Sequence, residues 1–407
     1  MNETTTKFFP YLERLLDGEE VEWKTLGEVA ELYAGLSGKN KEHFQKGNAP
    51  YVTYKNIFEN LAVDSSILEM VSIEADERQH AIKYGDILIT GSSENIEEVG
   101  MASVVTFHPE TEIYLNSFSF GIRFHSAIQL SPEFTKYLFR SDLLRKQIMK
   151  TASGVTRFNV SKKKFLAITL PIPPLRVQAR IVEILDKFTQ LEAELQAELE
   201  ARRKQYAYYR DQLLNFSQYP PLNVNIEWKT LGEMAEIGTG SSNRQDEAEN
   251  GVYPFYVRSK NILRSSTYQF DETAIIIPGE GGIGDIFHYT EGKYALHQRA
   301  YRIKVNAENE LFPKFLFYYM TNAFKPFILS RCVGATATSI RKPMLTDFPI
   351  PIPPLSEQRR IVDILDRFDT LTNSISEGLP REIALRRKQY EYYRDALLNF
   401  PQPTPTA

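Results

Sequence analysis

The spacing of Gly279, Gly281 and Gly284 could support chemistry, because it fits a dinucleotide-binding loop and follows an apolar, strand-like run. Pro278 precedes the loop, however, and residues 285–289 read as another strand where that motif needs a helix. No Lys-Ser or Lys-Thr pair follows, as a phosphate-cradling P-loop would require. We therefore expect a tight turn that lets the backbone approach a ligand, and no cofactor loop.

A second candidate is the Glu-x-Lys pattern of a nuclease metal site, which occurs at Glu22 to Lys24 and again at Glu227 to Lys229. That chemistry needs a further carboxylate upstream to hold the metal. No Pro-Asp pair precedes either copy. The repetition favours a different interpretation, in which the intervening tryptophan is an aromatic anchor that opens each half of the chain.

The other residue types of catalytic sites do not form recognisable groups. The histidines show no metal-ligand spacing with one another or with the single cysteine, Cys332. Neither the tetrapeptide of an amino-group methyltransferase nor a nucleophile-elbow serine occurs. We therefore expect a chain without catalytic residues and without a metal site or cofactor of its own. The six histidines are His43, His80, His108, His125, His288 and His297.

The bulk composition bounds the class of protein. A chain of 407 residues with 42% hydrophobic content is too long for one core and suits about two or three globular domains. One cysteine suits a reducing cytoplasm, and no segment reaches the length of a signal peptide or a transmembrane helix. The net charge of -4 argues against a generic polyanion binder, so nucleic-acid binding would need a local patch or a basic partner.

Polar, basic loops at matching places in the two halves are better candidates than any catalytic motif. They pair residues 54–57 with 258–262, residues 91–93 with 279–284, and residues 153–164 with 334–342. Lys and Arg can contact phosphates or guanine edges, and Asn can form two hydrogen bonds to adenine. Each loop alone is most often just solvated, but recurrence at equivalent positions predicts a reading surface. The candidate DNA-contacting residues are Lys55, Asn56, Ser92, Ser93, Thr156, Arg157, Asn159, Lys162, Lys163, Arg258, Lys260, Asn261, Gly281, Gly282, Thr336, Thr338, Ser339, Arg341 and Lys342.

These loops lie within a frame that the chain carries twice. The heptapeptide Glu-Trp-Lys-Thr-Leu-Gly-Glu at residues 22–28 returns unchanged at 227–233. Pro-Ile-Pro-Pro-Leu at 171–175 returns at 351–355, and the Arg-Arg-Lys-Gln-Tyr block at 202–206 returns at 386–390. Between the shared blocks the two halves differ. A repeat with a constant frame and variable contents predicts one scaffold that presents two different reading heads.

The segments after the prolines carry the heptad spacing of long helices. Because a proline run fits neither a strand ladder nor a helix interior, we expect it to be a stiff extended link. The tandem at residues 192–199 adds a four-residue stutter, and Gly378 and Pro380 predict a break in the second helix. We expect the two helices to pack antiparallel as a rigid spacer. The predicted helix or partner interface comprises Ile181, Phe188, Leu195, Leu199, Tyr206, Tyr209, Ile361, Phe368, Tyr390 and Tyr393.

The variable segments read as mixed α/β. Strand-like runs occupy residues 81–90, 118–124, 273–278 and 301–305, and helix-like runs occupy 132–150 and 312–329. We expect an α/β (α+β) chain of two globular mixed domains joined by two long antiparallel coiled-coil helices, with an internal pseudo-two-fold repeat. The predicted domains are 1–169, then a proline link and helix at 170–218, then 219–349, and a second link and helix at 350–407.

At these repeated blocks the chain resembles a specificity (S) subunit of a type I restriction–modification system. Residues 366–400 and the Glu-Ala-Glu-Leu/Gln-Ala-Glu-Leu tandem resemble the IC subgroup of that family. The resemblance implies two target-recognition domains that each read half of a split double-stranded DNA site, with the helices setting the unread gap. It also implies two docked methyltransferase (M) subunits, which bring S-adenosylmethionine, and restriction (R) subunits, which bring ATP- and Mg-dependent cleavage. The S subunit itself would catalyse nothing.

Two other classes remain open from the residues alone. One is a non-catalytic scaffold whose two heads bind peptide or glycan, which the matched basic loops disfavour. The other is an enzyme whose site assembles between the halves, for which no motif provides support.

Overall fold

The computed structural model describes residues 9–219, 226–331 and 339–402. The chain forms two compact units. Unit 1 comprises residues 1–194 and 383–407, and unit 2 comprises residues 195–382. Each unit therefore combines one variable segment with parts of the long helices.

The core of unit 1 contains a four-stranded sheet with the strand order β2-β9-β5-β7, and all of its pairs are antiparallel. A second sheet, β4-β3-β8, pairs β3 with β8 in parallel. A third, smaller sheet has the order β10-β11-β6. The strands are β2 (Ala30–Ala34), β3 (Ala49–Val52), β4 (Glu69–Val71), β5 (Ile87–Thr90), β6 (Ser92–Ser93), β7 (Ala102–Val104), β8 (Tyr114–Leu115), β9 (Ser119–Phe124), β10 (Ala152–Ser153) and β11 (Phe158–Val160).

Unit 2 repeats this plan with a different sequence. Its first sheet has the order β14-β21-β18-β19, and its second, β16-β15-β20-β17, again contains one parallel pair, β15 with β20. The main sheets thus share one topology, so the two variable segments have one fold despite their different sequences. The strands are β14 (Ala235–Thr239), β15 (Tyr253–Tyr256), β16 (Leu263–Ser265), β17 (Phe270–Asp271), β18 (Ala274–Pro278), β19 (His288–Thr290), β20 (Lys293–Leu296) and β21 (Ala300–Val305).

Each unit is closed by a two-stranded ladder between the repeated Trp motif and the repeated proline motif. In unit 1, β1 (Glu22–Thr25) pairs with β12 (Thr169–Ile172), which places Trp23 opposite Pro171. In unit 2, β13 (Glu227–Thr230) pairs with β22 (Pro349–Ile352) in the same register. The expectation that the prolines stay outside any ladder is therefore wrong. A two-stranded ladder consists of edge strands only, where the missing N–H of proline can face outward.

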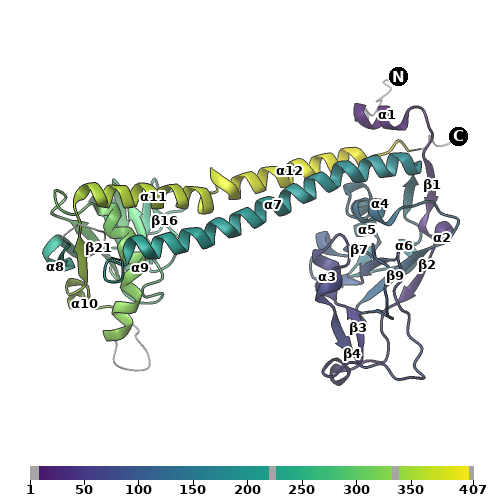
Figure 1. Ribbon diagram of the computed structural model, residues 1–407, viewed down its shortest axis with the longest axis horizontal. Coiled ribbons are helices and arrows are strands. Elements are labelled where there is room, and N and C mark those ends of the chain that lie inside the picture. Colours follow the sequence, from purple (N-terminus) through teal and green to yellow (C-terminus); the bar gives the residue numbers. More distant parts are fainter. Residues whose placement is uncertain (1–8, 220–225, 332–338, 403–407) are drawn as a thin grey trace. The chain divides into compact units, whose positions relative to one another are not determined.

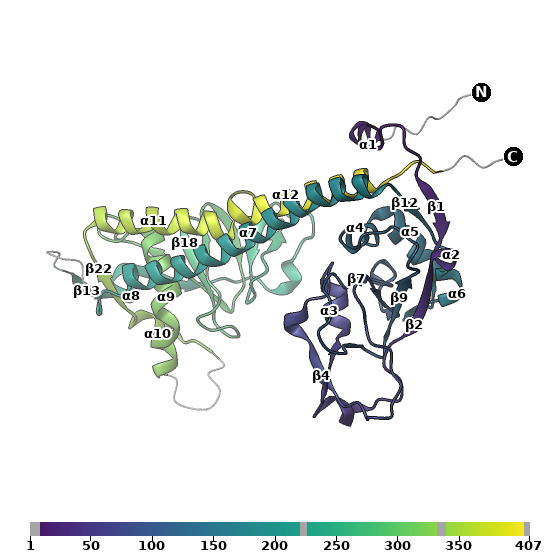
Figure 2. The same cartoon turned by 45° about the vertical axis from the view of Figure 1, so that its right-hand side comes forward.

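Helices pack on the main sheet in each unit. In unit 1, α4 (Pro132–Leu138) packs on β7 and shares a core with Ile87 and Ile89 of β5, whereas α3 (Tyr54–Glu59) packs on β5 and β7 and shares the core on the other face with Leu88 (Figures 1 and 2). In unit 2, α9 (Pro313–Arg331) packs on β18. The predicted helix at 132–150 is two helices, because α4 ends before Ser141 begins to cap α5 (Asp142–Thr151). The remaining short helices are α1 (Pro10–Leu16), α2 (Leu26–Val29), α6 (Lys162–Phe165), α8 (Leu231–Met234) and α10 (Lys342–Thr346).

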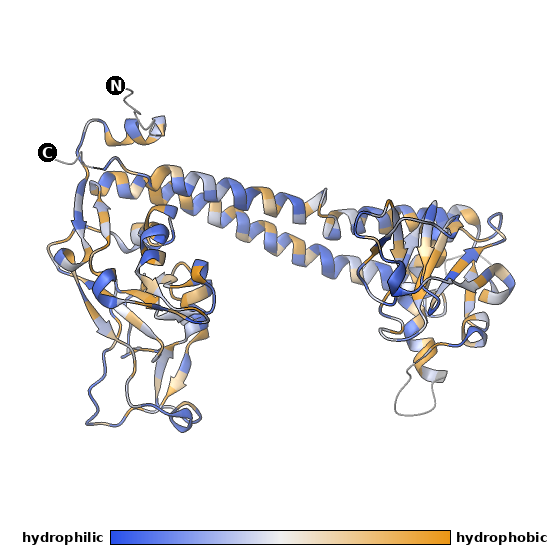
Figure 3. Ribbon diagram, turned by 180° about the vertical axis from the view of Figure 1, so that it is seen from behind, coloured by the Kyte–Doolittle hydropathy of each residue, from blue (hydrophilic) through white to orange (hydrophobic). Residues whose placement is uncertain are grey.

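The long helices follow the predicted pattern, including the break. Helix α7 (Leu175–Leu214) is continuous, whereas the second helix is divided into α11 (Leu355–Asn373) and α12 (Gly378–Leu398). Pro380 is the third residue of the resumed helix, where its missing N–H leaves no bond unmade. Figure 3 shows apolar and polar residues alternating along these helices, as amphipathic packing requires.

Within each unit, the two helical segments pack antiparallel through aromatic side chains. In unit 1, Phe188 stacks on Tyr393 with ring centroids 5.4 Å apart, and one turn further Glu192 bonds Arg387 at 2.5 Å. In unit 2, Phe368 stacks on Tyr206 and on Tyr209, each at 5.9 Å. Leu199 is buried and Leu195 is half-buried, whereas Ile181 and Ile361 lie in the cores of their own units. The main role of Tyr206, Tyr209 and Tyr393 is therefore to pack the two helical segments together.

Candidate nucleic-acid interface

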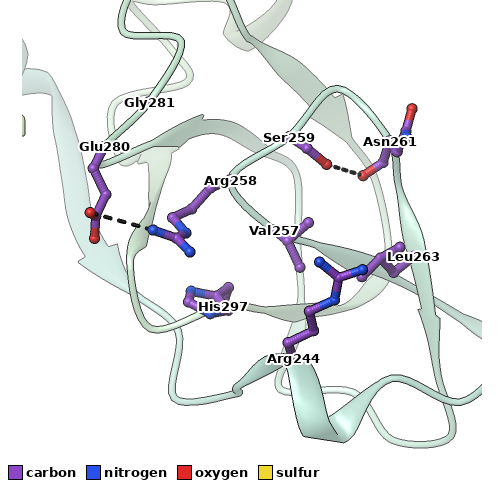
Figure 4. A pocket seen from close by; sticks show the side chains of 9 residues that line it. All are labelled: Arg244, Val257, Arg258, Ser259, Asn261, Leu263, Glu280, Gly281 and His297. Carbon is purple, nitrogen blue, oxygen red and sulfur yellow. Dashed lines mark hydrogen bonds and ion pairs between the residues drawn. The ribbon is translucent and has the colours of Figure 1, made fainter. Parts of the chain in front are cut away.

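Unit 2 carries a surface hollow of about 760 Å³ at the point where two of the predicted loops meet. Arg258 and Asn261 come from the loop after β15, and Gly281 comes from the glycine-rich turn after β18 (Figure 4). The rest of the wall consists of Arg244, Val257, Ser259, Leu263, Glu280 and His297. The structure thus brings together three predicted residues from two loops that are separate in the sequence.

The glycine-rich run is a tight turn, as expected. Gly281, Gly282 and Gly284 have φ values of +70°, +58° and +73°, which side chains rarely tolerate. At Gly279 a Cβ would lie 2.8 Å from the carbonyl oxygen of Arg299, so the backbones approach closely there. Strand β19 follows the turn, which excludes the strand–loop–helix arrangement of a dinucleotide site.

Glu280, at the tip of this turn, holds two guanidinium groups at the hollow. One carboxylate oxygen lies 2.8 Å from Arg299 Nη1, and the other lies 3.4 Å from Arg258 Nη1. The ring of His297 lies beside them, and its Nδ1 accepts a hydrogen bond of 3.0 Å from the Arg299 backbone N–H. Burial first, and then the positive charges of Arg258 and Arg299, lower the pKa of His297 below its ordinary value. A neutral ring whose Nδ1 accepts must carry its proton on Nε2.

Unit 1 has a hollow of about 590 Å³ at the corresponding place. All three predicted loop sets reach it, through Lys55, through Ser92 and Ser93, and through Arg157. The other lining residues are Tyr54, Phe58, Glu94, Glu98 and Phe118.

Arg157 is held by a serine that the sequence also singled out. Its Nε and Nη2 atoms donate to Ser92 Oγ at 3.0 and 2.8 Å. The Tyr54 hydroxyl in turn donates to the Ser92 carbonyl at 2.9 Å. Ser92 is 7% exposed, so it positions Arg157 and has little surface of its own for a ligand.

Asn56 is a correction to the predicted interface. It is fully buried, and its amide bonds the backbone of Asp64, with Nδ2 donating to the carbonyl at 2.8 Å and Oδ1 accepting from the N–H at 3.0 Å. A side chain whose donor and acceptor are both used inside the fold has no face left for adenine. Neighbouring Lys55 has a side chain that is 77% exposed and remains a candidate.

The other predicted residues lie outside the two hollows. Lys162 and Lys163 are exposed on α6, where the Lys162 ammonium lies 5.6 Å from the centre of the Phe120 ring. Arg341 and Lys342 are exposed at the start of α10. Further exposed candidates are Thr156, Asn159, Lys260, Gly282 and Ser339, whereas Thr336 and Thr338 lie outside the described residues.

Two half-buried arginines that the sequence did not reveal hold the walls of the unit 1 hollow. Arg140 donates to the carbonyls of Ile57 and Phe58 at 2.8 and 2.9 Å, at the end of α3. Arg145 donates to the carbonyls of Val99 and Gly100, each at 2.7 Å, behind the loop that carries Glu94 and Glu98. Burial lowers the pKa of both guanidinium groups to about 10, so both stay charged at neutral pH.

An equivalent backbone hydrogen bond holds the edge of the hollow in both units. In unit 1 the Gly91 N–H donates to the Phe118 carbonyl, and in unit 2 the Gly279 N–H donates to the Arg299 carbonyl, at 2.9 and 2.8 Å. Phe118, 65% exposed, therefore occupies the place of Arg299. Neither residue was among the predicted contacts. Both stand just before a strand with alternating apolar residues, so an alignment of the two strand starts would have matched them.

Two further hollows, of about 740 and 530 Å³, lie at the last turns of the repeated helix blocks. Unit 1 contributes Tyr392, Asp395 and Asn399, and unit 2 contributes their repeat equivalents Tyr208, Asp211 and Asn215. Tyr392 and Tyr208 are 63% and 59% exposed. These two surfaces thus share a tyrosine, an aspartate and an asparagine at repeat-equivalent positions, whereas other wall residues, such as Lys146 in unit 1 and Asn322 in unit 2, differ.

Within residues 9–219, 226–331 and 339–402, no group of three or more His, Cys, Asp or Glu side chains is placed to hold a metal ion. No helix in this described part of the chain is both long and apolar enough to cross a membrane.

The fold and the two hollows define a binding protein with two heads that arose by duplication. The sequences of its long helices repeat, whereas the sequences of its two heads differ. Residues 18–201 and 223–385 match the family of the type I restriction modification DNA specificity domain. The chain is 34% identical to the type I restriction enzyme EcoR124I/EcoR124II specificity subunit of Escherichia coli, over 97% of this chain and 98% of the relative. The chain belongs to the type I restriction–modification DNA specificity family.

Solved structures of this class have the same fold. A specificity subunit from Thermoanaerobacter tengcongensis superposes with a TM-score of 0.54 at 21% identity, covering 98% of each chain. A chain from a structural study of type I restriction–modification complex assembly superposes with a TM-score of 0.62 at 19% identity, covering 94% of this chain and 98% of that one. The alternative of a scaffold for peptide or glycan has no support among these relatives.

Proposed function

We propose that the two heads of this specificity subunit each read one half of a bipartite double-stranded DNA site. The observation that carries the proposal is the pair of equivalent hollows. The same backbone hydrogen bond, at Gly91 in unit 1 and at Gly279 in unit 2, places Phe118 on the wall with Lys55 in unit 1, and in unit 2 places Arg299 next to the wall, paired with the lining residue Glu280. A constant frame with exchanged contact residues is what two different half-sites require.

The cationic side chains of the hollows support a DNA ligand, although the unit 1 wall also carries Glu94 and Glu98 and the unit 2 wall carries Glu280. Each contains at least two cationic side chains, Lys55 and Arg157 in unit 1 and Arg244 and Arg258 in unit 2. Local patches of this kind suit phosphates and base edges, whereas the net charge of -4 does not favour indiscriminate binding. The exposed lysines of α6 and the cations at the start of α10 would extend the backbone contact.

We propose that the long helices set the unread gap and dock two methyltransferase (M) subunits. Duplicated surfaces suit two copies of one partner, and the hollows at Tyr208 and Tyr392 are such a pair. Exposed tyrosines with nearby polar groups are typical of protein interfaces. Restriction (R) subunits would join this assembly.

In this arrangement the chain supplies specificity and no catalytic step. The M subunits would bind S-adenosylmethionine and methylate adenine, and the R subunits would use ATP and Mg for translocation and cleavage, in the cytoplasm. We assign the chain to the IC subgroup, on the four-residue tandem of α7 and on residues 366–400. The proposed domains are 1–169 and 219–349 for recognition, with links and helices at 170–218 and 350–407.

Methylome sequencing tests this function. A host lacking endogenous adenine methylation would express this chain with its cognate M subunit. We expect a bipartite adenine-methylated motif with a fixed gap. An assembled complex that leaves the genome unmethylated, or methylates a continuous motif, would contradict the two-head proposal.

A further inference from the structure

The unit 2 hollow has the chemistry of a guanine-reading site. Building on the proposed function, we propose that Arg258 contacts the O6 and N7 atoms of a guanine in the major groove, and that Glu280 positions its guanidinium for that contact. The half-site read by unit 2 therefore contains a guanine whose recognition depends on this pair.

The side chains on the wall of the hollow are mostly hydrogen-bond donors, so they favour a base edge that presents hydrogen-bond acceptors. Arg244 and Arg258 present guanidinium donors, and the tautomer of His297 leaves an Nε2–H as a third donor. Among the residues that the structure describes, Glu280 is the single carboxylate on the wall, and it is already paired with Arg258 and Arg299. Guanine presents two acceptors, O6 and N7, in the major groove, whereas adenine pairs an acceptor with a donor and cytosine presents a donor.

The position of Glu280 makes it an orienting group. It stands on a turn that backbone hydrogen bonds hold at Gly279, whose N–H donates to the Arg299 carbonyl at 2.8 Å and whose carbonyl accepts from the Ile340 N–H at 2.7 Å. It holds Arg258 at 3.4 Å, and Figure 4 shows the guanidinium between this carboxylate and the His297 ring. The Arg258 side chain is still 46% exposed, which leaves donors for a ligand. A guanidinium fixed in this way favours one planar, two-bond contact over loose attraction to any phosphate.

Unit 1 differs at each of these points, which confines the inference to unit 2. Phe118 stands in place of Arg299, and no carboxylate on that wall forms an ion pair with Arg157 within the described residues. Arg157 is held by a neutral serine instead. The half-site of unit 1 thus provides an internal control.

The first test compares methylomes of the full complex with two variants and a matched control. Arg258→Lys keeps the charge but loses the planar fork, and Glu280→Gln keeps the shape but loses the charge. Arg264→Lys is the control, because Arg264 neighbours the wall residue Leu263 on β16 and points to the opposite face of the strand. We expect both test variants to relax one guanine position in one half-site, and the control to leave the motif unchanged.

The second test measures binding of the complex to a duplex in which that guanine is replaced by 7-deazaguanine, which lacks the N7 acceptor. We expect a loss of about tenfold in affinity for the unmodified complex, and no further loss for the Arg258→Lys complex. Glu280→Gln should also raise the affinity for DNA of unrelated sequence, because it releases two guanidinium groups. A carboxylate with only a folding role would not have that effect.

Several results would overturn the guanine assignment while leaving the two-head function intact. They are a bipartite motif that neither test variant relaxes, relaxation at a base other than guanine, and indifference to 7-deazaguanine. A uniform loss at both half-sites would identify Arg258 as a phosphate contact. If Arg258→Lys lowers the melting temperature, Glu280→Gln carries the test alone. Failure of the proposed function is distinct, since it gives no bipartite methylation by the unmodified complex.

Discussion

Asn116 and His297 hold the same turn in the two recognition heads. Asn116 Oδ1 accepts a hydrogen bond of 3.0 Å from the Phe118 N–H, and His297 Nδ1 accepts one of 3.0 Å from the Arg299 N–H. Both residues also donate their own N–H to the parallel strand, to Val52 and to Tyr256. An amide oxygen and an imidazole nitrogen thus perform one structural task, and the residue two positions later is free to differ between the heads.

This equivalence predicts that His297→Asn keeps the turn and His297→Ala does not. The alanine variant leaves the Arg299 N–H without its side-chain acceptor, which costs about 1 kcal/mol. Hydrogen exchange at residues 297–300 measures the effect locally. We expect protection close to that of the natural protein for His297→Asn and clearly faster exchange for His297→Ala. Equal protection in both variants would show that the ring nitrogen does not hold the turn.

The same histidine predicts a loss of stability in mild acid. Its pKa in the folded protein is lowered from the ordinary value of 6.5, so below that pH the unfolded chain binds more protons than the folded chain. The contribution is complete above pH 6.5 and is lost as pH falls from there through the lower folded value. Urea unfolding between about pH 8 and about pH 5 should show this decline. His297→Asn should make it less steep, and the remainder comes from His288, whose pKa is also lowered by burial. An unchanged slope in the variant would contradict the assignment.

Gln178 and Gln358 are a second pair of equivalent residues in the repeat, and they predict where a substitution destabilises each unit most. Gln178 is fully buried, donates to Pro173 and Gln129 carbonyls at 2.8 and 2.7 Å, and accepts from the Ser131 N–H at 2.9 Å. Gln358 makes the same three kinds of contact in unit 2.

Replacing either glutamine by leucine leaves three backbone groups without their side-chain partner. Because each unsatisfied buried group costs about 1–3 kcal/mol, we expect a loss of at least about 3 kcal/mol in the affected unit. Differential scanning calorimetry of the full chain measures it. Gln190→Leu, at an exposed position of α7, is the control and should shift the melting by little. A shift no larger than the control would mean that these networks contribute little.

Much of this fold can be predicted from periodicity and punctuation, because those signals are local. The strands at 119–124 and 274–278, the helix at 313–331 and the break before Gly378 follow from apolar spacing, glycine and proline. The proline ladders could not be predicted in this way. Pairing of Trp23 with Pro171 depends on contact between residues far apart in the sequence.

The residues of the hollows could be predicted in part, because loop composition is also a local signal. Comparison of the polar loops in the two halves is enough to predict Lys55 and Arg258. Asn56 was wrongly predicted to face DNA, because a loop composition gives no sign of which side chain turns inward. Thr53 caps a short helix, and the inner face of that helix carries Asn56. Phe118 and Arg299 are recognisable as equivalents only once the turns at Gly91 and Gly279 are in place.

The break between α11 and α12 depends on a glycine that no other residue can replace without strain. Gly378 has a φ of +73°, and an added Cβ would lie 2.4 Å from the Thr370 carbonyl oxygen. Gly292 has a φ of +85° with nothing within 4 Å of the added atom. The two glycines therefore separate the cost of conformation from the cost of the clash.

We expect Gly292→Ala to cost about 1 kcal/mol, the ordinary cost of a left-handed alanine. Gly378→Ala should cost at least about 2 kcal/mol more, because the carbonyl it meets is backbone and cannot turn aside. Urea unfolding followed by circular dichroism measures both. Equal costs would mean that the helix break relaxes readily and is not fixed by Gly378.

The four-residue tandem in α7 allows the gap hypothesis to be tested by deletion. Removing residues 196–199 takes away about one helical turn and about 6 Å. Leu195 then takes the place of the buried Leu199, so the apolar face is kept. Methylome sequencing of the deletion variant should therefore show the same two half-sites with a gap shortened by at most about two base pairs.

Removing only residues 196–197 is the control, since it turns the following helix by about 200° and misaligns the apolar face. That variant should lose methylation. An unchanged gap in the four-residue deletion, or altered half-site letters, would exclude α7 as the element that sets the spacing.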